Sequence, residues 1–229
     1  MAFLVSGFIF GFLIPYMARR FSKFMPATMA YGLYRLIWPV KRVSKEKRNK
    51  NGKYQKLAEQ YLMRSLGWAI VTAALSYCVY SCLNSGFYLA FIWMLLLLYE
   101  IDERMMLLPD IITVPVLILG FLQASLLPVS GADLVSPALA SAIGAVVGYI
   151  LPVVATLFMV KKHPDAFGGG DIKLLAGVGA WLGFEAVPFV ILLSSIIFGF
   201  YCLAKRARAG AFGPAIVIAT IVLVFFLKV

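Results

Sequence analysis

Eight continuous apolar segments divide this chain, and apolar runs of this kind are typical of helices in a lipid bilayer. Several are shorter than the roughly 20 residues that span a bilayer comfortably. The runs do not alternate apolar with polar residues, which argues against a β-barrel. The segments fall at about 2–18, 64–84, 86–101, 111–130, 135–160, 172–185, 187–204 and 211–227.

The composition supports the same class of protein. Of 229 residues, 62% are hydrophobic and only 14% are charged, which is far more apolar than a soluble domain. We therefore expect an all-α fold, a polytopic membrane protein with about eight transmembrane helices. We expect two regions: an N-terminal membrane region at 1–85, with a basic loop at about 19–63, and a six-helix core at 86–229.

The basic residues indicate a topology. With the N-terminus outside, the inside loops are 19–63, 102–110, 161–171 and 205–210, and of all lysines and arginines only Lys228 falls outside. Positive residues favour the cytoplasmic side, so we expect both termini on the outer side. The net charge of +11 is then explained by topology and does not require nucleic acid as a partner.

Two parts of the first inside loop have separate interpretations. The basic stretch 41–56 is expected to be a solvated loop near anionic head groups, with a substrate-docking surface as the alternative. The apolar and aromatic stretch 25–39 is expected to lie along the membrane interface as an amphipathic helix.

Several hydrolytic chemistries lack their residues. The one histidine, His163, has no obvious serine partner for a Ser-His protease. The cysteines Cys78, Cys82 and Cys202 form no Cys-x-x-Cys pair, so a zinc ribbon is excluded. Carboxylates remain as the candidate catalytic groups.

Two acids stand at the ends of apolar segments. Asp102 ends the third segment and Asp171 opens the sixth, so the predicted topology brings both to the inside boundary of the bilayer, with Glu100 at a similar depth. Ionisable groups at membrane depth are costly and usually functional. Each has a structural alternative: Asp171 as a helix N-cap, and Asp102 as an interfacial acid paired with Arg104.

The stretch "GGGDIKL" at 168–174 adds three glycines before Asp171. Glycine lacks a side chain and permits positive φ, so an extended peptide could approach closely beside the acid. Two carboxylates held together share one proton and titrate as a unit. The ionised member can take a proton from water while the other polarises a peptide carbonyl.

Three ordered motifs resemble those of the type IV prepilin peptidases, which are GxGD-type intramembrane aspartyl proteases. The first is "DERMMLLPDIITVPVLILG", which starts at Asp102. "GGGDIKL" is similar to the second, and "AFGPAI" at 211–216 is similar to the family's late Phe-Gly-Pro. The resemblance covers about residues 86–225.

The resemblance implies site residues and a substrate. Asp102 and Asp171 would be the catalytic pair, and Gly168, Gly169, Gly170 and Lys173 would contact the substrate. That substrate would be a type IV prepilin or a type II secretion pseudopilin, cut at the cytoplasmic face of the bacterial inner membrane. Proteolysis would need no cofactor and no metal, and the pilus or secretion machinery would be a further partner.

The chain also departs from the family pattern. It lacks the two zinc-binding Cys-x-x-Cys pairs of many members, and "GFLIPYMARR" at 11–20 only loosely resembles the family's first-helix motif. Those regions are associated with methylation of the new N-terminus by S-adenosylmethionine, so peptidase activity is the better supported expectation. Two other classes stay open: a small proton-coupled transporter, and a non-catalytic assembly factor.

Overall fold

The computed structural model describes residues 2–24, 52–126, 136–159, 168–206 and 210–227. Two sequence predictions lie outside the described residues. One is the interfacial helix at 25–39, and the other is the conformation of most of the basic stretch 41–56. His163 also lies outside them.

Each predicted apolar segment forms a helix, and the described residues contain no strand. The prediction of an all-helical membrane protein is therefore confirmed. Four helices are long and apolar enough to cross a membrane, namely α1, α4, α7 and α9, while α6 and α10 are shorter apolar helices. The helices are α1 (Ala2–Phe24), α4 (Gly52–Leu83), α5 (Gly86–Met105), α6 (Asp110–Leu126), α7 (Pro137–Met159), α8 (Gly169–Leu182), α9 (Ala186–Lys205) and α10 (Gly213–Leu227).

Helices α1 and α4 extend beyond the apolar segments predicted at 2–18 and 64–84. Helix α1 continues to Phe24, and α4 begins at Gly52, twelve positions before the apolar segment predicted from 64. The first turns of α4 read "GKYQKLAEQ", which is polar but rich in residues with high helix propensity and contains no proline. The apolar residues from 64 predict the membrane segment, whereas the helix propensity of the preceding polar residues lets α4 begin at Gly52.

The described structure divides into two compact units, Met1–Asn84 and Ser85–Val229. In the first unit, α1 packs against α4 through two glycines one turn apart. A Cβ atom at Gly11 would lie 2.5 Å from the carbonyl oxygen of Trp68, and one at Gly7 would meet Ser76. Small residues four positions apart let two membrane helices approach closely, so these glycines set the spacing of the pair.

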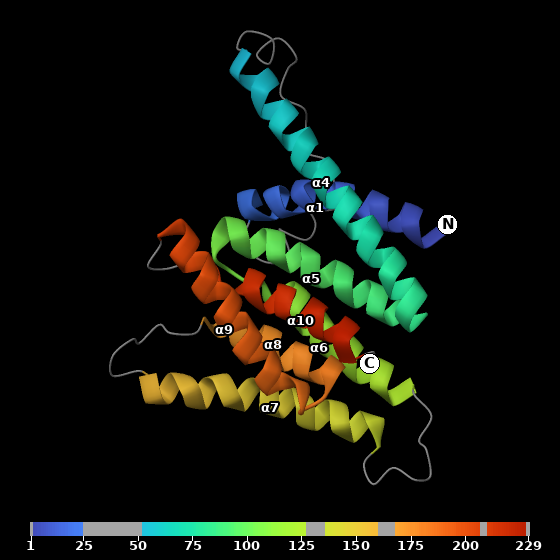
Figure 1. Ribbon diagram of the computed structural model, residues 1–229, viewed down its shortest axis with the longest axis vertical. Helices are drawn as coiled ribbons and strands as arrows, with labels where there is room; N and C mark the ends of the chain where they lie inside the picture. The colour runs from blue at the N-terminus through green and yellow to red at the C-terminus, as the bar shows by residue number, and fades with distance from the viewer. Residues whose placement is uncertain (1, 25–51, 127–135, 160–167, 207–209, 228–229) are drawn as a thin grey trace. The chain divides into compact units, whose positions relative to one another are not determined.

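The second unit contains α5 to α10, and α10 contacts α5, α8 and α9 (Figure 1). Its core forms around Trp181 of α8. The Trp181 ring stacks on Phe91 of α5 with centroids 4.3 Å apart, and its indole nitrogen donates a hydrogen bond of 2.8 Å to the carbonyl of Val116 in α6. One buried side chain thus fixes three helices to one another.

Helices α7 and α8 approach most closely where glycines face each other. A Cβ atom at Gly144 would collide with the carbonyl of Gly179, and one at Gly148 would collide with the carbonyl of Leu175. The hydroxyl of Ser141 donates a hydrogen bond of 2.8 Å to the carbonyl of Ala180. This contact anchors α8, whose N-terminal turn carries one of the candidate acids.

Candidate active site

Asp102 lies in the last turn of α5 and is 4% exposed. Its Oδ2 accepts a hydrogen bond of 2.9 Å from the backbone amide of Gly213, the first residue of α10. The first amides of a helix have no partner within it, and the helix dipole favours an anion there. The N-terminus of α10 therefore holds the carboxylate of α5 in place.

The pairing of Asp102 with Arg104, which the sequence left open, is wrong. The guanidinium of Arg104 binds Glu100 instead, with nitrogen–oxygen distances of 2.8 and 2.6 Å. These two residues are four positions apart, so they share one face of α5. Glu100 is fully buried, and the guanidinium of Arg104 compensates its charge. Asp102 accepts its hydrogen bond from the amide of Gly213.

Asp171 lies in the first turn of α8 and is partly exposed. The N-cap of α8 is Gly168, so Asp171 stands three residues later and is not itself the N-cap. Its carboxylate accepts a hydrogen bond from the backbone amide of Gly168, and its own amide donates to the Gly168 carbonyl at 3.0 Å. An acid at this position commonly reaches back to the N-cap amide, and this contact fixes its direction.

The structure brings the two aspartates together. Asp102 and Asp171 are 69 positions apart in sequence, yet the charge of Asp102 acts directly on Asp171. Helices α5 and α8 both contact α10, and Leu108, after α5, lies against Gly170 at the start of α8. When one carboxylate disfavours the charge of another in this way, the two can share one proton.

The three glycines before Asp171 matter because they lack side chains, and not because they adopt unusual backbone angles. Among the described residues, the only glycine with positive φ is Gly183, so residues 168–170 do not use the positive φ that glycine permits. A Cβ at Gly170 would lie 2.8 Å from the Cβ of Leu108, whereas one at Gly169 would meet nothing within 4 Å. Gly170 permits tight packing, and Gly168 and Gly169 leave an exposed strip beside Asp171.

Leu108 connects the two acidic helix ends. It follows α5 in the short connection to α6 and is buried, and its contact with Gly170 seats that connection on the start of α8. Sequence reasoning missed Leu108, because a leucine in an apolar chain carries no distinct signal. Sequence reasoning named Gly213 only as part of the motif "AFGPAI". That motif was the available signal that Gly213 binds Asp102.

Lys173 binds a partner within the protein. Its ammonium lies 2.7 and 2.8 Å from the two carboxylate oxygens of Asp110, the first residue of α6. Both side chains are exposed by more than 40%. The ion pair joins the first sequence motif to the second, so a role of Lys173 in binding substrate would require it to leave or share Asp110.

These features define a polytopic helical membrane protein in which the charge of one acidic side chain acts on a second acid at a distant helix end. The comparison with family models then identifies the family. Residues 89–203, half of the chain, match the model of the type IV leader peptidase family, and the chain belongs to that family. This match contains both Asp102 and Asp171.

Individual relatives agree with the family match. The chain is 34% identical over 167 residues to the prepilin leader peptidase/N-methyltransferase of Dichelobacter nodosus, and 34% identical over 173 residues to the protein of that name from Pseudomonas putida. The matches cover 71% and 72% of this chain, but only 56% and 58% of those relatives. A third relative, from Vibrio cholerae serotype O1, is 29% identical over 181 residues, which is 76% of this chain and 69% of the relative. No solved structure matches the chain.

Proposed function

We propose that this protein is a membrane-embedded aspartyl endopeptidase that removes the basic leader from type IV prepilins or type II secretion pseudopilins. The observation that carries the proposal is the placement of Asp102 and Asp171: Leu108, in the connection after α5, lies against Gly170 at the start of α8, and the charge of Asp102 acts on Asp171. Membership of the type IV leader peptidase family supports it. No observation favours the transporter or the assembly factor that the sequence left open.

The proposed reaction uses one proton shared by the two carboxyl groups. The ionised aspartate takes a proton from water, which attacks the scissile carbonyl carbon, while the protonated aspartate donates a hydrogen bond to the carbonyl oxygen. The hydrogen bond from Gly213 favours the charged form of Asp102. The amide of Gly168 favours the charged form of Asp171 in the same way, so either aspartate can act as the base while the other holds the shared proton.

The exposed strip at Gly168 and Gly169 is the proposed place for the substrate backbone. A substrate helix has its carbonyls hydrogen-bonded within itself, so the segment to be cut must be held extended. A Cβ at Gly169 would meet no neighbouring atom, which leaves room for a peptide beside Asp171. Lys173 would lie at the edge of that strip.

Methylation of the new N-terminus is a second proposed activity with weaker support. The names of the relatives include N-methyltransferase, and the reaction would need S-adenosylmethionine as methyl donor. The chain lacks the two zinc-binding cysteine pairs found in many such proteins. We also propose the bacterial inner membrane as the location, with both termini periplasmic and the two aspartates on the cytoplasmic side, on the basis of the positive-inside pattern.

One experiment tests both activities. The purified protein, reconstituted in proteoliposomes, is incubated with a panel of prepilins and pseudopilins, with and without S-adenosylmethionine. Mass spectrometry reads loss of the leader and gain of a methyl group separately. We expect leader loss in both conditions, and an intact leader in every substrate would contradict the proposal.

A further inference from the structure

A single peptide group links the start of α10 to Asp102. On its amide side, Gly213 donates the hydrogen bond to the carboxylate. On its carbonyl side, Phe212 accepts from the amides of Ala215 and Ile216, at 3.0 and 3.2 Å. A trans peptide unit is planar, and its N–H and C=O point in opposite directions. The placement of Phe212 therefore decides whether the Gly213 amide points at Asp102.

The first turn of α10 offers Asp102 one donor. Pro214 follows Gly213 and has no amide hydrogen. The next two amides already donate to the carbonyl of Phe212. In this turn, Asp102 therefore depends on the Gly213 amide, and a shift of the preceding connection would weaken the contact.

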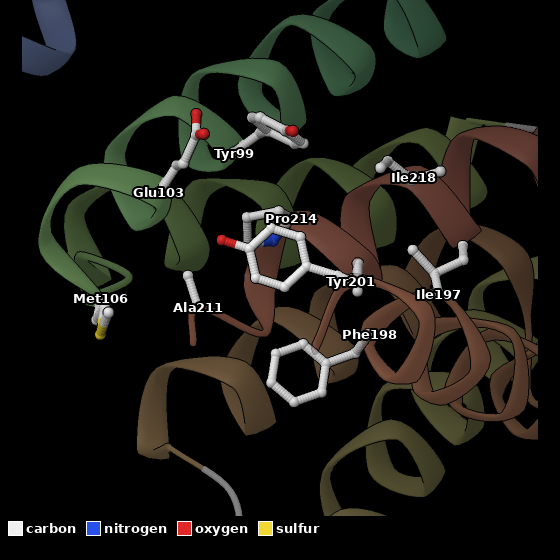
Figure 2. Close-up of a pocket in the computed structure, with 10 residues that line it drawn as sticks. Tyr99, Glu103, Met106, Ile197, Phe198, Tyr201, Ala211, Pro214 and Ile218 are labelled. Atoms are coloured by element: carbon white, nitrogen blue, oxygen red, sulfur yellow. The ribbon is translucent and has the colours of Figure 1, made fainter. Parts of the chain in front are cut away.

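Two aromatic rings of α9 hold that connection. The Phe198 ring packs edge-to-face on the Phe212 ring, with centroids 5.3 Å apart and planes at 88°. The Tyr201 ring is nearly parallel to the Phe198 ring, with centroids 6.4 Å apart. Gly210 lies against both rings, since a Cβ there would be 3.2 Å from Tyr201 and 3.6 Å from Phe198. Figure 2 shows both side chains on α9, and they line one pocket together with Pro214.

We propose that Phe198 and Tyr201 are positioning residues for the proposed cleavage. Through the connection at 210–212 they keep the amide of Gly213 hydrogen-bonded to Asp102. Phe198 is half-buried and Tyr201 is 38% exposed, so replacement of either ring should leave the fold of the second unit intact. This inference rests on the proposed function, because the reaction that it serves is cleavage at Asp102.

Phe198→Leu tests the first ring, because it keeps an apolar side chain and removes the edge-to-face contact. The energy of one such aromatic pair corresponds to about two- to tenfold in rate, so we expect kcat for leader cleavage to fall by about that factor. KM should not change, because the strip at Gly168 and Gly169 is not altered. The matched control is Phe200→Leu, the same change at a ring that is 69% exposed on the same helix, and it should leave kcat unchanged.

Two variants test the second ring. Tyr201→Leu removes the ring that covers Gly210 and should lower kcat by a similar factor. Tyr201→Phe keeps the ring and loses only the hydroxyl that binds Lys205, so it should retain the wild-type kcat. A Tyr201→Phe variant as impaired as Tyr201→Leu would contradict a role of the ring.

A double-mutant cycle with Gly213→Ala separates positioning from a general loss of activity. Residues that act through one contact have non-additive effects, whereas independent effects add in free energy. If Phe198 acts through the Gly213 amide, Phe198→Leu should lower kcat no further in the Gly213→Ala background. A double variant whose loss is the product of the two single losses would overturn the proposal.

Hydrogen exchange at the Gly213 amide gives a readout that does not depend on cleavage. A hydrogen-bonded amide in a packed region is protected from exchange, so Phe198→Leu should speed exchange at this amide by about two- to tenfold, and Phe200→Leu should not. Unchanged exchange, or unchanged kcat, in Phe198→Leu would overturn the positioning role and leave the proposed function standing. A wild-type protein that removes no leader would instead contradict the proposed function itself.

Discussion

The backbone amide of Gly213 donates a hydrogen bond of 2.9 Å to Oδ2 of Asp102, across 111 positions of sequence. This bond joins the first of the three sequence motifs to the last, and it places a buried carboxylate at the N-terminus of a helix. A buried acid without such a partner would carry a large desolvation cost. The bond therefore explains how Asp102 can keep a charge in an apolar surrounding.

Gly213→Ala tests that bond. A Cβ at this position would lie 2.6 Å from Oδ2 of Asp102, so the carboxylate has to move away from the amide. Loss of a hydrogen bond to a charged group costs about 1.5–3 kcal/mol, so we expect leader cleavage to fall by about 10- to 100-fold while the protein still inserts. Gly199→Ala in α9, where a Cβ meets no atom within 4 Å, is the matched control. Normal cleavage by Gly213→Ala would show that the contact does not position Asp102.

The glycines before Asp171 separate into two kinds. Gly170→Ala puts a methyl group against the side chain and backbone of Leu108, whereas Gly169→Ala adds one in open space. We expect Gly170→Ala to reduce kcat at least tenfold, because α8 and Asp171 are pushed away from the connection after α5. Gly169→Ala should change KM more than kcat, since it affects only the strip for the substrate. Equal effects of the two variants in steady-state cleavage assays would contradict this division.

The ion pair between Lys173 and Asp110 is exposed, so its contribution to stability should be small. We expect Lys173→Ala to lower the free energy of unfolding by under ~1 kcal/mol, as measured by denaturation in detergent. Suppose that Lys173 affects cleavage only through its ion pair with Asp110 of α6. Lys173→Glu and Asp110→Lys should then each lower cleavage, and the double variant should restore it. Failure of the double variant, with a folded protein, would favour direct contact between Lys173 and the substrate.

The apolar runs predicted where the helices are, because burial in lipid imposes apolarity along the whole segment. The polar first turns of α4, from Gly52, were missed, since they form by propensity and not by apolarity. The acids Asp102 and Asp171 were visible as charges at segment ends. Their partners were not, because the amide of Gly213 and the packing of Leu108 depend on which helices meet in three dimensions.

The close approach of α7 and α8 gives a prediction about stability. Gly144→Ala forces a methyl group into the carbonyl of Gly179, and overpacking of this kind typically costs about 1–3 kcal/mol. We expect a lower midpoint of thermal unfolding in detergent, and reduced activity because α8 carries Asp171. In the control, Gly199→Ala should leave the midpoint unchanged or raise it slightly. A Gly144→Ala protein as stable as the wild type would contradict the packing described for these two helices.

The most direct measurement of the central claim is leader cleavage by Asp102→Asn and Asp171→Asn in reconstituted membranes, with insertion and helix content checked in parallel. Asparagine keeps the size of the side chain but cannot exchange the shared proton. General acid–base catalysis contributes about 100- to 10,000-fold, so each variant should lose at least ~100-fold in kcat, and the double variant should lose little more. Near-normal processing by either correctly inserted single variant would contradict the account.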